Sequence, residues 1–268
     1  MFGRRADAKR VEGISQTRRF MPFVSPRRND SLVYYTTEIE VDRALVFLEE
    51  QNKERAGAAR ITLFHLYLKA LADTLYERPG VNRFVAGGRL WQRDGVYLTY
   101  SAKQEMLEGA PVLTIKRRFD RDERLIRMVD AFAEELQARR RGKLSTADKE
   151  MNLALHAPGF LIRLGLKLIS LADHFGLLPK GMIENDPMFS SAFVANLGSV
   201  GLDAGYHHLW EYGTCSIFAV VGHIHASPEG KRVIDVKYSF DERIEDGLYA
   251  ARSLQKIKAA LESPETLL

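Results

Sequence analysis

The stretch VKYSFDERIEDGLYAARSLQKIKAALESPETLL, residues 236–268, joins an alternating segment to a helical one through an acidic turn. Alternate residues from Val236 to Phe240 are apolar, which predicts a strand with one wet face. Apolar residues then recur along one side of a predicted helix that begins near Glu245 and ends at Pro264. Between them, the turn DERIEDG gathers four acids around one arginine. The segment therefore predicts a strand, an acidic turn and a helix in direct succession.

Strand and helix patterns are mixed along the rest of the chain. Strands are predicted at 31–42, 88–101, 110–118, 190–198, 215–224 and 232–240, and helices at 41–55, from 61 to the proline at 79, and at 122–141. No repeat and no low-complexity linker divides the chain. We therefore expect one α/β domain over 1–268, with a mixed sheet flanked by helices and a polar arm at 1–30.

The segment at about 151–186 has an unusual pattern and reads as an apolar helical insertion. From Phe160 to Leu171 the apolar residues point in nearly all directions, and only Arg163 and Lys167 interrupt them. A helix that is apolar all round is expected to be buried. Its own domain or a sister subunit is the expected cover, and contact with a membrane surface is the weaker alternative.

Composition and charge exclude several classes of protein. Lys and Arg are interleaved with Asp and Glu, so the formal charge of +4 forms no basic stripe and we expect no nucleic-acid partner. Cys215 is the only cysteine and lies in an apolar stretch, which predicts a packed thiol in a reducing compartment. The N-terminus has no apolar h-region, and no run is long enough to span a membrane. We expect a cytoplasmic protein.

An ordered set of segments resembles one known family. Three segments resemble the closing third of the catalytic cores of 2-oxo acid dehydrogenase dihydrolipoamide acyltransferases, which are relatives of chloramphenicol acetyltransferase. These segments are FVANLGSVGLDAG (193–205), CSIFAVVGHI (215–224) and the stretch 236–268. ITLFHLYLKALADTLYERPGVN (61–82) resembles the family's first long helix. The resemblance implies a chloramphenicol acetyltransferase-like two-layer sandwich, coenzyme A as the acyl-carrying substrate, and no covalent lipoyl group on this chain.

The same resemblance locates a site in the turn and shows that the site is altered. The family's turn reads Asp-His-Arg-x-x-Asp-Gly, and its histidine takes the proton from a thiol. Asp241, Arg243 and Asp246 match this turn, but Glu242 stands where the histidine would be. A carboxylate with a pKa of about 4.3 is a poor base for a thiol with a pKa of about 8.5. Burial of Glu242 would raise its pKa and narrow that gap.

The second family element is a hydroxyl that binds the oxyanion of the tetrahedral intermediate. In this chain the tetrapeptide is ANLG, so Ala195 stands at the position of the usual Ser or Thr. Asn196, Gly198 and Arg243 are the other substrate-binding residues that the resemblance implies. Losing one oxyanion donor typically costs about 10²–10³ in rate.

Two explanations of the altered site remain open. In the first, the chain is a divergent acyltransferase in which His207 or His208, from GYHHLWEYG at 205–213, works with Glu242 and Asp246. In the second, it is a catalytically inactive relative that serves as an oligomeric assembly or scaffold protein of a dehydrogenase complex. A structural reading of the histidine pair places one ring against Tyr206 or Trp210 and the other in water.

Metal ligation and assembly complete the predictions. His223 and His225 alternate at a strand end, but two histidines need further ligands, so we predict no metal site. The resemblance implies a homotrimer with the active-site channel between subunits, and larger cubic assemblies of such trimers. It also implies lipoyl-bearing or dehydrogenase subunits as partners.

Overall fold

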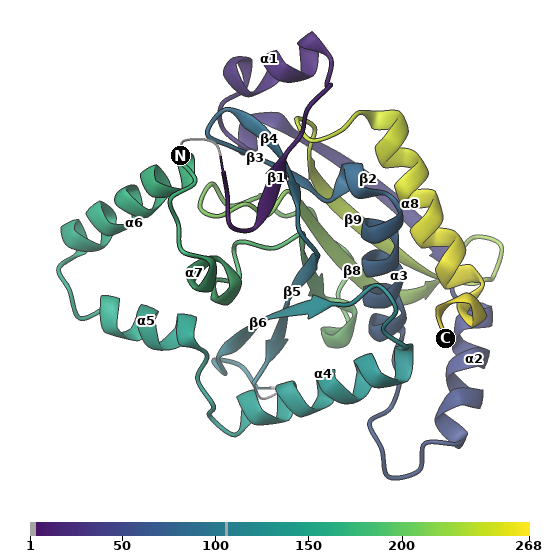
Figure 1. Ribbon diagram of the computed structural model, residues 1–268. Coiled ribbons are helices and arrows are strands. Elements are labelled where there is room, and N and C mark those ends of the chain that lie inside the picture. The colour runs from purple at the N-terminus through teal and green to yellow at the C-terminus, as the bar shows by residue number, and fades with distance from the viewer. Residues whose placement is uncertain (1–3, 105–106) are drawn as a thin grey trace.

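A mixed six-stranded sheet forms the centre of the molecule in the computed structural model, which describes residues 4–104 and 107–268 (Figure 1). The strand order is β2-β9-β8-β7-β5-β6. Neighbours are antiparallel except β7, which runs parallel to β5 and β8. The strands are β2 (Leu32–Glu40), β5 (Val96–Lys103), β6 (Val112–Phe119), β7 (Ala192–Asn196), β8 (Ile217–Ala226) and β9 (Arg232–Asp241). The predicted mixed sheet is confirmed.

Four helices share one hydrophobic core with this sheet. They are α2 (Asp42–Lys53), α3 (Leu63–Glu77), α4 (Leu125–Arg140) and α8 (Gly247–Glu262). Leu68 of α3 and Tyr100 of β5 are fully buried in that core. The helix α3 ends just before Pro79, as the sequence predicts, because proline cannot continue the backbone hydrogen-bond pattern. All four helices lie where the apolar periodicity places them.

The N-terminal arm is more ordered than its polar sequence suggests. β1 (Ala8–Arg10) pairs with β4 (Arg89–Arg93), which pairs with β3 (Arg83–Ala86), so a separate three-stranded sheet forms, and α1 (Gln16–Val24) follows β1. Arg5 holds the arm down, because its buried guanidinium lies 2.9 Å from Asp7 and 2.7 Å from Asp173. Neither the three-residue strand β1 nor the ion pairs of Arg5 produce a periodic pattern of apolar residues. The sequence pattern therefore did not predict them.

Helices α5 (Thr146–Ala154), α6 (Gly159–His174) and α7 (Lys180–Asn185) connect α4 to β7. Figure 1 shows α5 and α6 extending away from the sheet. No residue of α6 is buried, and its Phe160 side chain is 69% exposed. Only the C-terminal end of α6 packs on the body, through Ile169 and Ala172 against the cluster of Leu178, Ile183 and Phe189.

The sequence expected α6 to be covered either by its own domain or by a sister subunit. The first cover is absent among residues 4–104 and 107–268, because there α6 packs only at one end. None of the helices in the described ranges has the length and apolar run that a membrane span needs.

The start of α3 contains a capping box made by Thr62 and His65. The backbone N–H of Thr62 donates to Nδ1 of His65 over 3.1 Å, and the backbone N–H of His65 donates to the Thr62 hydroxyl over 3.4 Å. The His65 ring is buried at 4.7 Å from the ring of Phe132. Burial, aided by the positive charge of Arg55, lowers the pKa of His65 to about 4.

We expect the stability of the protein to fall as the pH drops from about 6.5 to about 4. The unfolded chain takes up a proton on His65 near pH 6.5, whereas the folded chain resists protonation until about pH 4. The free energy of unfolding should therefore lose on the order of 3 kcal/mol across that window, measured by urea denaturation. His65→Gln keeps a capping side chain without the titration, so its loss should be clearly smaller. An equal loss in the variant would contradict this assignment.

Candidate active site

The acidic turn after β9 is built on a buried ion pair between Asp241 and Arg243. Nε of Arg243 donates to Oδ1 of Asp241 over 2.8 Å, and Nη2 donates to Oδ2 over 2.7 Å. Both side chains are almost completely buried. Nη1 of Arg243 also donates to the carbonyl oxygens of Ser25 and Pro26, over 3.1 and 2.9 Å. The pair therefore fixes the turn and ties it to the segment before β2.

A second buried arginine, Arg28, lies beside this pair. Its Nε is 3.8 Å from Oδ2 of Asp241, its Nη2 donates to the Gly213 carbonyl over 3.0 Å, and its Nη1 donates to the Trp210 carbonyl. Burial lowers the pKa of Arg28, and the negative charge of Asp241 opposes that shift. One buried carboxylate thus faces two buried guanidinium groups, and this cluster holds the turn and the loop at 205–213 together.

Three of the turn's acids have structural partners, and Glu242 does not. Besides Asp241, Glu245 is 2.6 Å from Arg83, and Asp246 caps α8 by accepting a bond from the Tyr249 N–H over 2.8 Å. Glu242 is exposed, and its carboxylate makes no hydrogen bond or ion pair within the described part of the chain. The burial that would raise the pKa of Glu242 is therefore not found in the single chain.

The negative charge of Glu242 nevertheless affects the pKa of the neighbouring Tyr35. Burial first, and the nearby charges of Glu242 and Asp246 second, raise the pKa of the Tyr35 hydroxyl. The backbone N–H of Glu242 donates to the Ser31 carbonyl over 3.0 Å, so the main chain is fixed while the side chain is free to meet a ligand. Glu242 is thus a predicted site residue with an exposed carboxylate on a fixed main chain.

The NLG segment lies at the end of β7, in a tight approach to β8. Ala195 pairs with Val220 and is half-buried, so no hydroxyl is available at this position. Asn196 accepts the Ser199 backbone N–H over 3.2 Å. Gly198 is required by packing, because a Cβ there would lie 2.5 Å from the carbonyl oxygen of Gly222. Asn196 and Gly198 therefore shape the strand end.

The two adjacent histidines of the loop at 205–213 have different environments. The His207 ring stacks on Phe218, with ring centroids 4.1 Å apart, and lies 5.1 Å from Trp210. The His208 side chain is exposed. No hydrogen bond or ion pair connects either histidine to Glu242 among residues 4–104 and 107–268. This arrangement favours the structural reading of the pair within one chain.

A cavity of about 650 Å³ adjoins the turn and is lined by basic side chains. Its arginines come from β1, α1 and β4: Arg10, Arg18, Arg19 and Arg89. Nη1 of Arg18 donates to the carbonyl oxygens of Glu242 and Arg243, both over 3.1 Å, so Arg18 links the lining of this cavity to the turn. The sequence pattern does not join these arginines, because Arg89 lies far along the chain from the other three.

A second cavity, of about 470 Å³, lies behind the turn. Arg28 and Arg243 line it from the buried cluster, and Ser170 and Asp173 line it from the anchored end of α6.

Cys215 is buried and donates to the Ile217 carbonyl over 3.2 Å, as expected for a packed thiol.

The comparisons with known proteins rest on structure. No protein-family model matches the chain, and no curated protein matches it in sequence. The dihydrolipoamide acetyltransferase of Azotobacter vinelandii matches with a TM-score of 0.64 and 17% identity, over 97% of this chain and 94% of that one. A probable dihydrolipoamide acetyltransferase from Listeria monocytogenes 4b F2365 matches with a TM-score of 0.62 and 17% identity, over 95% of both chains. The fold is that of the dihydrolipoamide acetyltransferase cores.

A chloramphenicol acetyltransferase shares this acyltransferase-core fold, with a TM-score of 0.54 and 15% identity over 95% of this chain and 99% of that one. The fold class that the sequence predicted is therefore confirmed. Sequence identities of 15–17% show the fold alone. The chemistry of the candidate site depends on this chain's own residues, above all on Glu242 and Ala195.

Proposed function

We propose that this protein transfers acyl groups from coenzyme A thioesters, using Glu242 in place of the usual histidine. The observation that carries the proposal is the intact turn, in which the buried Asp241–Arg243 pair presents Glu242 outward without a partner. In the Azotobacter enzyme, a serine, a histidine and an asparagine were examined for their role in the catalytic mechanism, the last two being four residues apart. Glu242 and Asp246 have the same spacing.

The proposed reaction is an exchange between two thiols. The acceptor thiol gives its proton to the Glu242 carboxylate, and its sulfur attacks the thioester carbonyl. When the tetrahedral intermediate collapses, the bond from carbon to the sulfur of coenzyme A breaks and that sulfur takes up the proton. Because a carboxylate is a weak base for a thiol and Ala195 offers no hydroxyl to the oxyanion, we expect slow transfer.

The basic cavity suits the phosphate groups of coenzyme A. Arginine binds phosphate through paired N–H donors, and the cavity presents Arg10, Arg19 and Arg89 together with Arg18, which already contacts the turn. A coenzyme bound there would have its phosphates close to the main chain of Glu242.

We expect the double variant Arg19→Ala/Arg89→Ala to raise KM for acyl-CoA by about a hundred-fold or more, because each charge-assisted bond to phosphate is worth about 1.5–3 kcal/mol, which is roughly ten- to a hundred-fold in affinity. The effect on kcat should be small, since neither side chain contacts the turn. Arg27→Ala removes an exposed guanidinium outside this cavity and serves as the matched control. Unchanged KM in the double variant would place the coenzyme elsewhere.

A role in assembly is the second candidate, and the exposed apolar helix α6 favours it. Phe160, Leu164 and Leu168 are each more than half exposed, and apolar surface of this extent marks interaction sites. One matching structure is the cubic core of a pyruvate dehydrogenase multienzyme complex. We propose that this chain forms trimers, with Glu242 and the NLG strand end of different subunits facing one channel.

An acyl-exchange assay and an assembly assay distinguish the two candidate functions. Acyl exchange between acyl-CoA and free dihydrolipoamide, lost in Glu242→Gln, supports the enzyme. A protein without measurable exchange that light scattering shows as a trimer, and that co-purifies with dehydrogenase subunits, supports the assembly role. A joint role of His207 or His208 with Glu242 requires a subunit interface, because they do not meet within one chain.

A further inference from the structure

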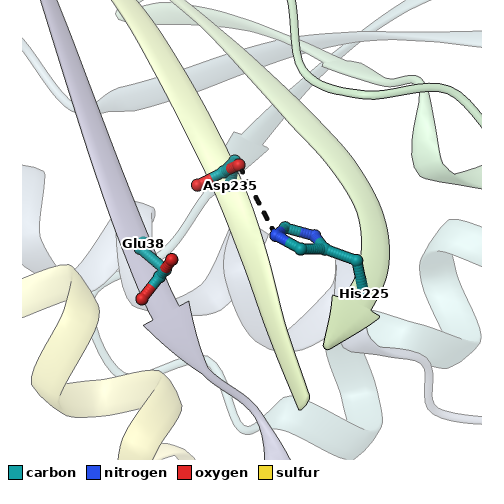
Figure 2. A group of neighbouring side chains, drawn as sticks. All are labelled: Glu38, His225 and Asp235. Carbon is teal, nitrogen blue, oxygen red and sulfur yellow. Dashed lines mark ion pairs between the residues drawn. The ribbon is translucent and has the colours of Figure 1, made fainter. Parts of the chain in front are cut away.

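Glu38, Asp235 and His225 form a cluster on the open face of the sheet (Figure 2). They come from the neighbouring strands β2, β9 and β8, and one ligand atom of each lies within 4.8 Å of the others. We propose that this cluster binds one divalent transition-metal ion, for which Zn²⁺ is the best-suited candidate.

The strand register brings the two carboxylates together. Glu38 is directly opposite Asp235 in the antiparallel pair of β2 and β9. Like charges opposite each other on adjacent strands repel and destabilise a sheet. A cation between them would turn that repulsion into attraction.

Nearby basic side chains do not supply that cation. Lys231 pairs with Glu40 over 2.6 Å, and the Lys258 ammonium donates to the main-chain carbonyl of Glu38 over 2.7 Å. In the described ranges, no Lys or Arg forms an ion pair with Asp235 or with the Glu38 carboxylate, and the His225 ring is the neighbour of Asp235.

A β-bulge delivers the imidazole to the same face. Val221 of β8 pairs with Val236, but three residues later Ile224 pairs with Ile234, so β8 contains one extra residue. His225 consequently lies opposite Val233, on the face that carries Asp235. Without the bulge it would face the other side of the sheet.

The orientation of the His225 ring suits a metal ligand. Its Nδ1 lies 3.4 Å from the main-chain carbonyl of His223, so a proton on Nδ1 points at that oxygen and leaves the lone pair of Nε2 free. Ligating histidines usually donate their second N–H in this way. Nε2 is 3.8 Å from Oδ2 of Asp235, too long for a hydrogen bond.

The chemistry of the donors selects the metal. An ion bound tetrahedrally with bonds of about 2.1 Å holds its ligand atoms about 3.4 Å apart. Small rotations of exposed or half-exposed side chains close the cluster to that size. Imidazole with carboxylates suits Zn²⁺, whereas Mg²⁺ and Ca²⁺ prefer oxygen ligands alone. Three protein ligands leave one position for water, and the bound ion would clamp the edge strand β2 to β8 and β9.

The test is Zn²⁺ titration of the tag-free protein by calorimetry, with a thermal melt of each sample. We expect one Zn²⁺ per chain and a higher Tm with Zn²⁺ but not with Mg²⁺. His225→Ala should weaken binding by at least about tenfold, since even the loss of a partner of a ligand costs 10–100-fold. Asp235→Asn should also weaken binding, and it should raise the Tm of the metal-free protein because the repulsion with Glu38 is relieved.

His223→Ala is the matched control, because its Nδ1 lies 3.2 Å from Asp203 instead of facing the cluster. It should bind Zn²⁺ as the wild type does. Three results would overturn the site: no binding by the wild type, unchanged affinity in Asp235→Asn, or equal losses in His223→Ala and His225→Ala.

Discussion

Replacing Glu242 by histidine is expected to make acyl exchange between acyl-CoA and dihydrolipoamide faster than in the wild type, and about 10²–10⁴ faster than in Glu242→Gln, which is the usual contribution of a positioned general base. Glu242 is exposed at the turn and has no partner in the described part of the chain, so an imidazole there is free to meet a thiol. The ordinary pKa of histidine, about 6.5, is roughly two units closer to that of a thiol than the pKa of a carboxylate is.

Adding Ala195→Ser to this variant should raise the rate by about another 10²–10³, because the serine hydroxyl would donate to the oxyanion. Glu242→Gln is the control, since it removes the carboxylate without supplying a base, and it should be slower than the wild type. A histidine variant no faster than Glu242→Gln would show that the turn does not face the reacting thiol.

Replacing Asp241 by alanine is expected to lower the free energy of unfolding by about 3–5 kcal/mol, the cost of breaking a buried ion pair from one side. The substitution leaves the Arg28 and Arg243 guanidinium groups buried without the carboxylate that lies between them. Urea denaturation followed by circular dichroism measures the effect.

Asp246→Ala provides a matched control in the same turn. Asp246 is exposed and caps α8, so its loss should cost only about 1 kcal/mol. Equal costs for the two variants would show that the buried cluster does not hold the turn.

The turn shows how far sequence reasoning reached. Its pattern predicted a strand, an acidic turn and a helix in direct succession, and β9, the turn at 241–247 and α8 agree with that. The pattern gave no information on the exposure of Glu242, because exposure depends on residues such as Ser31 and Arg18, which are distant in the sequence. The sequence left open whether Glu242 is buried, and in the single chain it is exposed.

The helix α6 shows a different limit. Periodicity correctly predicted a helix that is apolar all round, because that pattern is local. What covers such a helix is a property of tertiary or quaternary structure, and its own domain leaves α6 uncovered. The order of the N-terminal arm was missed for a similar reason, since it depends on the contact between Arg5 and Asp173.

The basic cavity and the proposed metal cluster were also beyond the sequence pattern. Glu38 and His225 are far apart along the chain, and only the sheet order and the bulge in β8 bring them to one face. His223 and His225 have no further ligands near them in the sequence, so the pattern predicted no metal site. The metal cluster is a product of register, which a one-residue change in strand pairing would destroy.

The most direct test of the central claim is the rate of acyl exchange by the wild type and by Glu242→Gln, with a panel of acyl-CoA thioesters and dihydrolipoamide as the acceptor. Mass spectrometry of the acylated product gives both rates against the reaction without protein. We predict slow exchange above the uncatalysed rate for the wild type, and exchange near the uncatalysed rate for the variant. Wild-type exchange at the uncatalysed rate with every thioester, or equal rates for the two proteins, would contradict acyl transfer at this turn.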